Sequence, residues 1–213
     1  MKIEFEVWFS RKASKELRSL RPVFEQLSKV HEDYTNAEPG PDFSFWYSER
    51  PQIGLLSAAV WLRGKTALEE YAAPKENGKK RCRGDLYIRT GKNTTFECEA
   101  KHLTLNLGKS TAELVRNAEK HVDKAAKEAI LLTEARHYLG LCFLTPWGSE
   151  STPDRDRRCL QVIDRLKPTN IRSHCDALVW IHGRTPVHRK NKKKLYPGLL
   201  LAVKEATKAK AAR

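Results

Sequence analysis

The sequence feature that most constrains the fold is a pair of short segments with alternating side chains, residues 85–90 and 94–101. The residues between them, 91–93, include a glycine and an asparagine, which are typical of a tight hairpin turn. Alternation of apolar and polar residues over four to eight positions is the pattern of a strand with one buried face. We therefore expect two neighbouring antiparallel strands in the middle of the chain.

The second of these segments separates apolar from charged side chains by face. Successive side chains of a strand point to opposite faces, so Phe96, Cys98 and Ala100 share one face, while Glu97, Glu99 and Lys101 share the other. The apolar face is expected in the core, and the hairpin brings Asp85 from the neighbouring strand beside the charged face. The sequence thus predicts carboxylates and an ammonium gathered on one sheet, an arrangement that needs a reason such as a metal if it is buried.

Hydrophobic periodicity predicts a mixed order of helices and strands around this hairpin. Helical spacing covers residues 13–31 with Pro22 near a break, 110–132 and 155–166, and a buried helix runs from its cap Ser48 to Gly64. Strand patterns cover residues 66–72, 138–144, 177–181 and 199–203, with a short edge strand expected at 43–47. Such a mixture implies a sheet with helices on its faces, and hence an α/β or α+β architecture. We expect residues 1–42 to form a helical appendage packed on a core domain of residues 43–213.

The charge of the chain points to a polyanionic partner. Lys and Arg outnumber Asp and Glu by 40 to 26, which gives a formal net charge of +14. Nucleic acid is the commonest partner of such a chain, although a basic composition also serves solubility alone. The densest basic segment lies between two predicted strands and supplies the candidate phosphate contacts: Arg184, Arg189, Lys190, Lys192, Lys193 and Lys194. A solubilising loop is the alternative for this segment, since no aromatic residue interleaves to stack on bases.

The sequence predicts neither export nor a membrane span. Acidic residues follow the first methionine closely, and charges interrupt the longer apolar stretches. The five cysteines are widely spaced and include no Cys-x-x-Cys pair, so we expect reduced, packed thiols in a cytoplasmic protein.

The polar groups on the hairpin suit the hydrolysis of a phosphodiester. That reaction requires charge neutralisation at the phosphate and an activated water molecule, and Mg²⁺ supplies both while binding one or two carboxylates plus waters. Asp85 and Glu99 are suitable ligands, and the backbone carbonyl of Ala100 is a candidate third ligand. Lys101 is a candidate to orient or deprotonate the attacking water. Glu97 lies outside this set and is expected to support the site or to face solvent.

This arrangement resembles the active site of the PD-(D/E)XK nuclease superfamily, whose pattern is an Asp on one strand and Glu-x-Lys on the next. Asp85 stands for the Asp, Glu99 and Lys101 stand for Glu-x-Lys, and Gly84 occupies the place of the loosely kept Pro. The resemblance covers roughly residues 49–144. It implies a restriction-endonuclease-like mixed central sheet flanked by helices, and an endonuclease that cuts DNA with Mg²⁺, or with Mn²⁺ as a substitute.

The helix that begins near Ser48 resembles the opening helix of Holliday-junction resolvases and related restriction-type enzymes. In those enzymes an acidic residue near the helix start completes the metal site, and Glu49 is its counterpart here. Glu69 and Glu70 are the alternatives. The resemblance leaves RNA open as a second substrate and a homodimer open as the assembly.

Three other interpretations of the same residues remain. Charged residues at alternate strand positions often form only a solvated face. The second interpretation is a nucleic-acid-binding protein that keeps the nuclease fold without its chemistry. The third is a protein-interaction module of a defence or mobile-element system. Salt-sensitive DNA binding without cleavage would favour the second interpretation, and no affinity for nucleic acid would favour the third.

Overall fold

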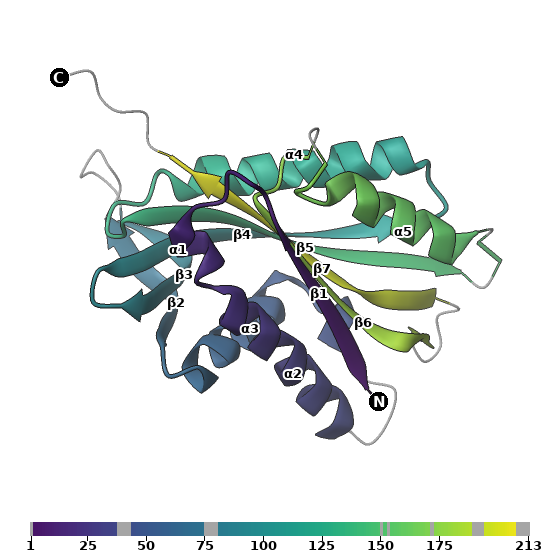
Figure 1. Cartoon of the computed structure of the whole chain (residues 1–213), viewed down its shortest axis with the longest axis horizontal. Helices are drawn as coiled ribbons and strands as arrows, with labels where there is room; N and C mark the ends of the chain where they lie inside the picture. The colour runs from purple at the N-terminus through teal and green to yellow at the C-terminus, as the bar shows by residue number, and fades with distance from the viewer. Residues whose placement is uncertain are drawn as a thin grey trace.

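A seven-stranded mixed sheet with helices on both faces forms the centre of the molecule (Figure 1). The computed structural model describes residues 2–37, 44–74, 81–149, 151–152, 154–170, 173–188 and 194–207. In chain order the elements are β1 (Ile3–Phe9), α1 (Lys15–Arg18), α2 (Arg21–Ala37), the 3-10 helix η1 (Ser44–Trp46), α3 (Glu49–Leu62), β2 (Thr66–Pro74), β3 (Arg81–Gly91), β4 (Thr94–Asn106), α4 (Thr111–Ala129), β5 (His137–Ser149), α5 (Arg155–Leu166), β6 (Ala177–His188) and β7 (Lys194–Ala206). The predicted α/β architecture is thus confirmed.

The strand order is β1-β6-β7-β5-β4-β3-β2. All neighbours pair antiparallel except β4 and β5, which pair parallel from Phe96↔His137 to Asn106↔Trp147. A parallel pair needs a crossover connection, and α4 provides it across one face of the sheet. The position of α4 therefore follows from the direction of β5.

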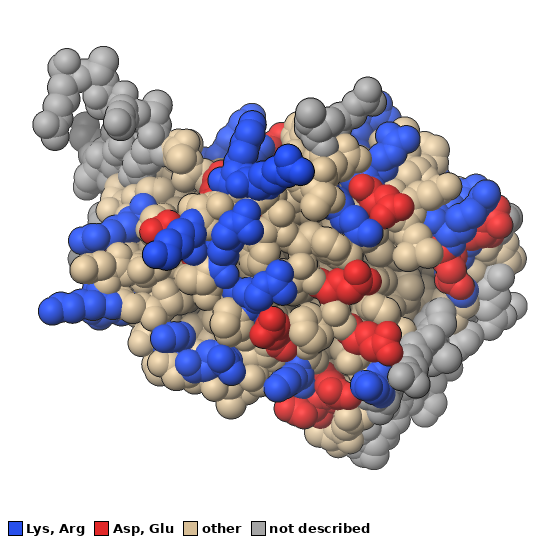
Figure 2. All heavy atoms as spheres, in the orientation of Figure 1, with Lys and Arg blue, Asp and Glu red and all other residues tan. Residues whose placement is uncertain are grey.

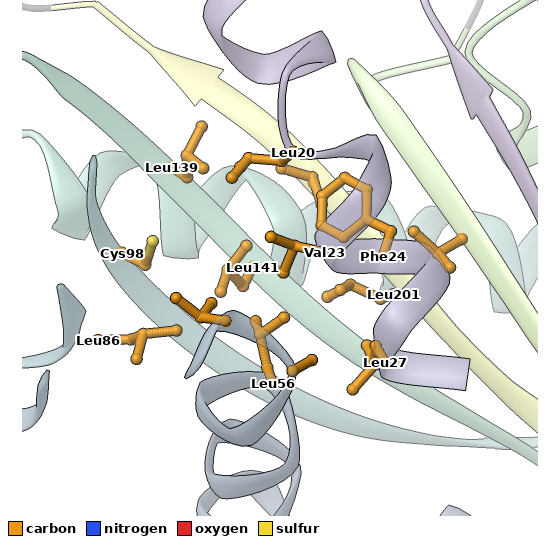
Figure 3. Packing of buried hydrophobic residues seen from close by; sticks show 14 of the residues in the cluster. Leu20, Val23, Phe24, Leu27, Leu56, Leu86, Cys98, Leu139, Leu141 and Leu201 are labelled. Atoms are coloured by element: carbon orange, nitrogen blue, oxygen red, sulfur yellow. The ribbon is translucent and has the colours of Figure 1, made fainter. Parts of the chain in front are cut away.

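Two hydrophobic clusters cover the two faces of the sheet. One unites α2 and α3 with the sheet. Figure 3 shows Leu20, just before α2, and Val23, Phe24 and Leu27 of α2 beside Leu56 of α3 and the strand residues Leu86, Leu139, Leu141 and Leu201. The other packs α4 and α5 on the opposite face through residues such as Leu114, Val122 and Ile163. The four cysteines with described side chains, Cys98, Cys142, Cys159 and Cys175, are free and buried in these layers.

Most predicted elements are present, with two differences near the N-terminus. The edge strand expected at residues 43–47 is wrong, because Ser44–Trp46 forms a 3-10 helix in which Phe45 is fully buried and its carbonyl accepts a hydrogen bond from Thr145 Oγ1 at 3.0 Å. The edge strand β1, for which the sequence analysis predicts no element, pairs with β6.

The segment before residue 42 contributes to the main sheet and its core. Its strand β1 belongs to the seven-stranded sheet, and its helix α2 shares one hydrophobic cluster with α3. The expected boundary at residue 42 falls within residues 38–43, outside the described residues. In the described part of the chain, the helices are too short or too polar to traverse a lipid bilayer.

Helix α4 lies very close to the sheet at Gly140 of β5. A Cβ atom added there would lie 2.3 Å from the backbone nitrogen of Ala126 and 2.7 Å from its Cα atom. We expect Gly140→Ala to lower the free energy of unfolding by about 2–3 kcal/mol, because backbone atoms must move to accept the methyl group. Urea denaturation measures the loss. Gly91→Ala is the control, since nothing lies within 4 Å of its added Cβ atom; equal stability of the two variants would contradict this close packing.

His31 of α2 makes the stability of the protein depend on pH. Its ring is fully buried, with Nδ1 2.5 Å from Ser44 Oγ, and burial lowers its pKa from 6.5 to about 3. Below pH 6.5 His31 binds a proton in the unfolded chain but stays neutral in the folded chain. The free energy of unfolding therefore falls as the pH drops towards 3. We expect this one group to contribute at most about 1.4 kcal/mol per pH unit. Urea titrations at several pH values should give a shallower slope for His31→Gln, and an unchanged slope would refute the assignment.

Candidate active site

The candidate site lies where β3 separates from β4. The register pairs the two strands from Gly91↔Thr94 to Leu86↔Cys98. Asp85 precedes Leu86 in β3, and its carboxylate accepts a hydrogen bond from the backbone nitrogen of Ala100 at 2.7 Å. Here the Asp85 side chain, and not a backbone carbonyl, accepts from the neighbouring strand. This hydrogen bond holds the Asp85 carboxylate against β4.

Glu99 stands beside Asp85 from the neighbouring strand. Burial, the negative charge of Asp85 and a hydrogen bond between the two carboxyl groups together raise the pKa of Glu99 to about 8, although the charge of Lys101 acts in the opposite direction. Two carboxylates so close together in a half-buried position repel each other unless a proton or a cation lies between them. The pair therefore forms the acidic centre of the site.

The Lys101 ammonium lies between the Ala100 carbonyl and Glu128 of α4. Its Nζ atom donates to the Ala100 carbonyl at 2.7 Å and contacts Glu128 Oε2 of α4 at 2.8 Å. Burial lowers the pKa of Lys101, but the hydrogen bond and the charge of Glu128 outweigh burial and raise that pKa above its ordinary value. In this arrangement Lys101 is a charged donor, which suits orientation of a water molecule better than its deprotonation.

Glu128 is the site residue that sequence reasoning missed. It lies near the end of α4 and faces Lys101 only because the crossover lays that helix over β4. The helical periodicity of residues 110–132 predicts which side chains turn inward. It does not predict which strand residue a half-buried Glu128 meets.

Glu49 is the first residue of α3 and reaches the same centre. Burial raises its pKa, the charge of Lys101 lowers it and that of Asp85 raises it again, and its carboxylate accepts a hydrogen bond from the backbone of His102. Among the candidate helix acids, Glu49 is thus the one that the structure brings beside Lys101 and Asp85. The His102 side chain lies on the opposite face of β4, with Nε2 3.0 Å from Thr145 Oγ1.

The two alternative acids face a neighbouring hollow. This hollow has a volume of about 500 Å³ and is lined by Glu49, Arg50, Ile53, Glu69, Glu70, Arg83 and Asp85. Glu70 pairs with Arg50 and Arg83 at 3.0 Å each, and it adopts a positive φ of 45° at a position skipped by the β2–β3 register. Glu70 thus forms ion pairs with two guanidinium groups at the rim of the site.

Of the two positions expected for Glu97, the structure excludes the one that faces solvent. Glu97 is fully buried rather than at the surface, and its carboxylate accepts hydrogen bonds from Tyr71 Oη at 2.7 Å and from the backbone nitrogens of Glu134 and Ala135 at 2.9 and 3.1 Å. The Tyr71 ring lies across Gly84, where an added Cβ atom would lie 2.6 Å from the ring. Glu97 thereby ties β2 and the entry to β5 onto β4.

The predicted basic loop lies largely beyond the described part of the structure. Residues 189–193 and the Arg184 side chain are outside the described residues, and the predicted phosphate contacts of Arg184, Arg189, Lys190, Lys192 and Lys193 lie there with them. Lys194 opens β7, and its ammonium lies 3.9 Å from the centre of the Trp147 ring. That cation–π contact holds Lys194 against β5.

The residues of the site supply few protein ligands, which is a number that Mg²⁺ accepts. Across the described segments, no group of three or more His, Cys, Asp and Glu side chains is arranged to hold a metal ion. Mg²⁺ takes one or two carboxylates and completes its shell with carbonyl, water and phosphate oxygens. Asp85 and Glu99, with the neighbouring Ala100 carbonyl, supply that number of hard oxygen ligands.

Comparison of this chain with known proteins identifies no relative. No protein-family model, curated protein or solved structure matches this chain. The resemblance to PD-(D/E)XK nucleases therefore rests on the residues and their geometry alone.

The buried Glu97 carboxylate gives a test of how the site is supported. We expect Glu97→Ala to lower the free energy of unfolding by about 3 kcal/mol or more, because it leaves buried donors without an acceptor. Differential scanning calorimetry and urea denaturation measure the loss. The control is Glu6→Ala on the exposed side of β1, which should change stability by less than about 0.5 kcal/mol. Similar losses in both variants would contradict a structural role for Glu97.

Proposed function

We propose that this protein is a Mg²⁺-dependent endonuclease of the PD-(D/E)XK type that hydrolyses phosphodiester bonds in DNA. The observation that carries the proposal is the convergence of four side chains from α3, β3 and β4: Glu49, Asp85, Glu99 and Lys101. A solvated strand face would not require the half-burial of two adjoining carboxylates, since that costs free energy without a cation.

The architecture around the site supports a restriction-endonuclease-like fold as part of the same proposal. A helix (α3) precedes a hairpin (β3–β4) that carries the acidic residues, and a crossover helix (α4) leads to a parallel strand (β5). This order resembles the core of the PD-(D/E)XK superfamily, which consists of a helix, strands, a helix and a strand. The net charge of +14 supports a polyanionic substrate, with DNA proposed over RNA.

The residues of the chain divide the work of hydrolysis among them. Asp85, Glu99 and the Ala100 carbonyl would hold Mg²⁺, which when bound polarises the scissile phosphate and acidifies a water molecule. Lys101, whose Nζ atom is 2.7 Å from the Ala100 carbonyl, stands where it can donate to that water or to a phosphate oxygen. Glu49 accepts from the backbone of His102 and limits the site on the α3 side.

Cleavage of supercoiled plasmid DNA tests the proposal. With Mg²⁺ or Mn²⁺ we expect nicking or linearisation, and a loss of at least about 100-fold in rate for Asp85→Asn and for Lys101→Met, because each removes a group that acts on the reacting atoms. Circular dichroism should report the fold of each variant as intact. Chelation with EDTA should stop the reaction, and readdition of Mg²⁺ should restore it.

The matched control is Glu113→Gln, which changes a partly exposed acid at the start of α4, away from the site, and should cut like the parent. Equal rates for the parent, Asp85→Asn and Lys101→Met would show that the cleavage comes from elsewhere.

A second candidate is a nucleic-acid-binding protein that keeps this fold without chemistry. The observation in its favour is that the polar groups satisfy one another: Asp85 binds the Ala100 nitrogen, and Lys101 binds Glu128. It requires salt-sensitive DNA binding with no cleavage at any divalent ion concentration, which the plasmid assay distinguishes.

A further inference from the structure

Helix α4 carries a line of cations on its exposed side. Arg116, Lys120, Lys124 and Lys127 are all exposed and follow one another by four, four and three residues, which places them on one side of the helix. We call these four residues the α4 basic stripe. At about 1.5 Å of rise per residue the stripe is about 16 Å long.

The stripe borders a hollow in which most acidic groups already have a cationic partner. The hollow has a volume of about 870 Å³, and the other residues that line it are Glu119, His121, Asp123, Glu128, Leu131 and His174. Asp123 contacts Lys204 Nζ at 2.6 Å and His174 Nδ1 at 3.1 Å, and Glu128 contacts Lys101 at 2.8 Å. Lys124 of the stripe also lies 3.9 Å from Glu128 Oε1, and the four cations of the stripe outnumber the three acids that line the hollow.

The hollow leads in one direction to the candidate site. Glu128 lines it and at the same time holds the Lys101 ammonium, so a ligand that lies along α4 reaches Lys101 at the end of the stripe.

In the other direction, His174 also lines a second hollow of about 750 Å³ that includes Arg11, Lys12 and Lys204. Figure 2 shows Lys and Arg side chains gathered over α1 and the turn that precedes it, next to this second hollow. The exposed basic residues of that region are Arg11, Lys12, Lys15, Arg18 and Arg21. The basic surface thus continues from α4 towards α1.

We infer that the α4 basic stripe binds the phosphate backbone of duplex nucleic acid and guides one strand to Lys101. This inference rests on the proposed function for the site at which the strand arrives. A length of about 16 Å matches about five successive phosphates of one strand along a duplex axis, at about 3.4 Å each. Phosphate contacts position the duplex without reading its sequence, so the stripe confers affinity and register rather than sequence specificity.

The composition of the hollow favours a duplex over a single strand. Proteins that bind single strands combine cations with aromatic rings on which bases stack. The described residues that line the hollow include no Phe, Tyr or Trp. The stripe thus offers charge without a stacking platform.

Fluorescence anisotropy with labelled DNA in EDTA tests the stripe separately from any chemistry. The probes are a duplex of about 20 base pairs and its single strand. We expect the triple variant Lys120→Ala/Lys124→Ala/Lys127→Ala to bind the duplex at least about tenfold more weakly, with a slope of log K against log salt smaller by about 2–3. The control is Lys29→Ala/Lys65→Ala/Lys92→Ala, which removes the same charge from exposed positions on α2, the turn after α3 and the β3–β4 turn and should bind like the parent.

The outcomes separate this inference from the proposed function. Weaker binding by the stripe variant alone supports the inference, even if the parent never cleaves DNA. Equal loss in both triple variants, or no loss in either, overturns it even if the parent is an active nuclease. Tighter binding of the single strand than of the duplex, or no DNA binding by the parent, also overturns it. Thermal unfolding of each variant verifies that it is folded.

Discussion

The parallel pairing of β4 with β5 is the constraint on which the rest of the structure depends. Antiparallel neighbours can be joined by short turns, but this pair requires a connection that crosses back over the sheet. Helix α4 makes the crossing, and the contact between Gly140 and Ala126 sets how closely it lies on the strands. Glu128 meets Lys101 because of that crossing, so the electrostatics of the candidate site depend on the topology of the sheet as well as on the hairpin.

The candidate site combines strong local repulsion with dense local hydrogen bonding. Asp85 and Glu99 stand together although burial and mutual repulsion oppose it, while the Ala100 nitrogen and carbonyl bind Asp85 and Lys101 on either side. The backbone of Ala100 therefore orients both the Asp85 carboxylate and the Lys101 ammonium. Because these contacts come from a strand in the middle of the sheet, the polar groups have little freedom to move apart. Such preorganisation is what a metal-dependent hydrolase requires of its scaffold.

The sequence predicted the local parts of this arrangement well. Alternation along residues 94–101 identified the strand that carries Glu99 and Lys101, and the cap at Ser48 located the helix that begins at Glu49. The remaining features depend on contacts between distant segments. Glu97 looks like its neighbour Glu99 in the sequence, yet the backbone of residues 134–135 folds over it and buries it completely. The pairing of strand β1 is equally hard to predict, because its partner strand β6 begins only at Ala177.

That remote partner has a consequence for how the chain acquires its structure. Strand β1 is near the start of the chain, but its hydrogen-bonding neighbour β6 begins at Ala177, and β5 pairs with β7 only from Lys194 onward. During synthesis the contacts of the hairpin β3–β4 become available early, whereas β1 and β5 gain β6 and β7 as neighbours only after residues 177–206 have been made. Long-range pairing of this kind slows folding, because chain closure costs entropy before any contact repays it. The topology thus joins an acidic hairpin whose contacts are local in the sequence to a sheet whose remaining pairings unite segments far apart in the chain.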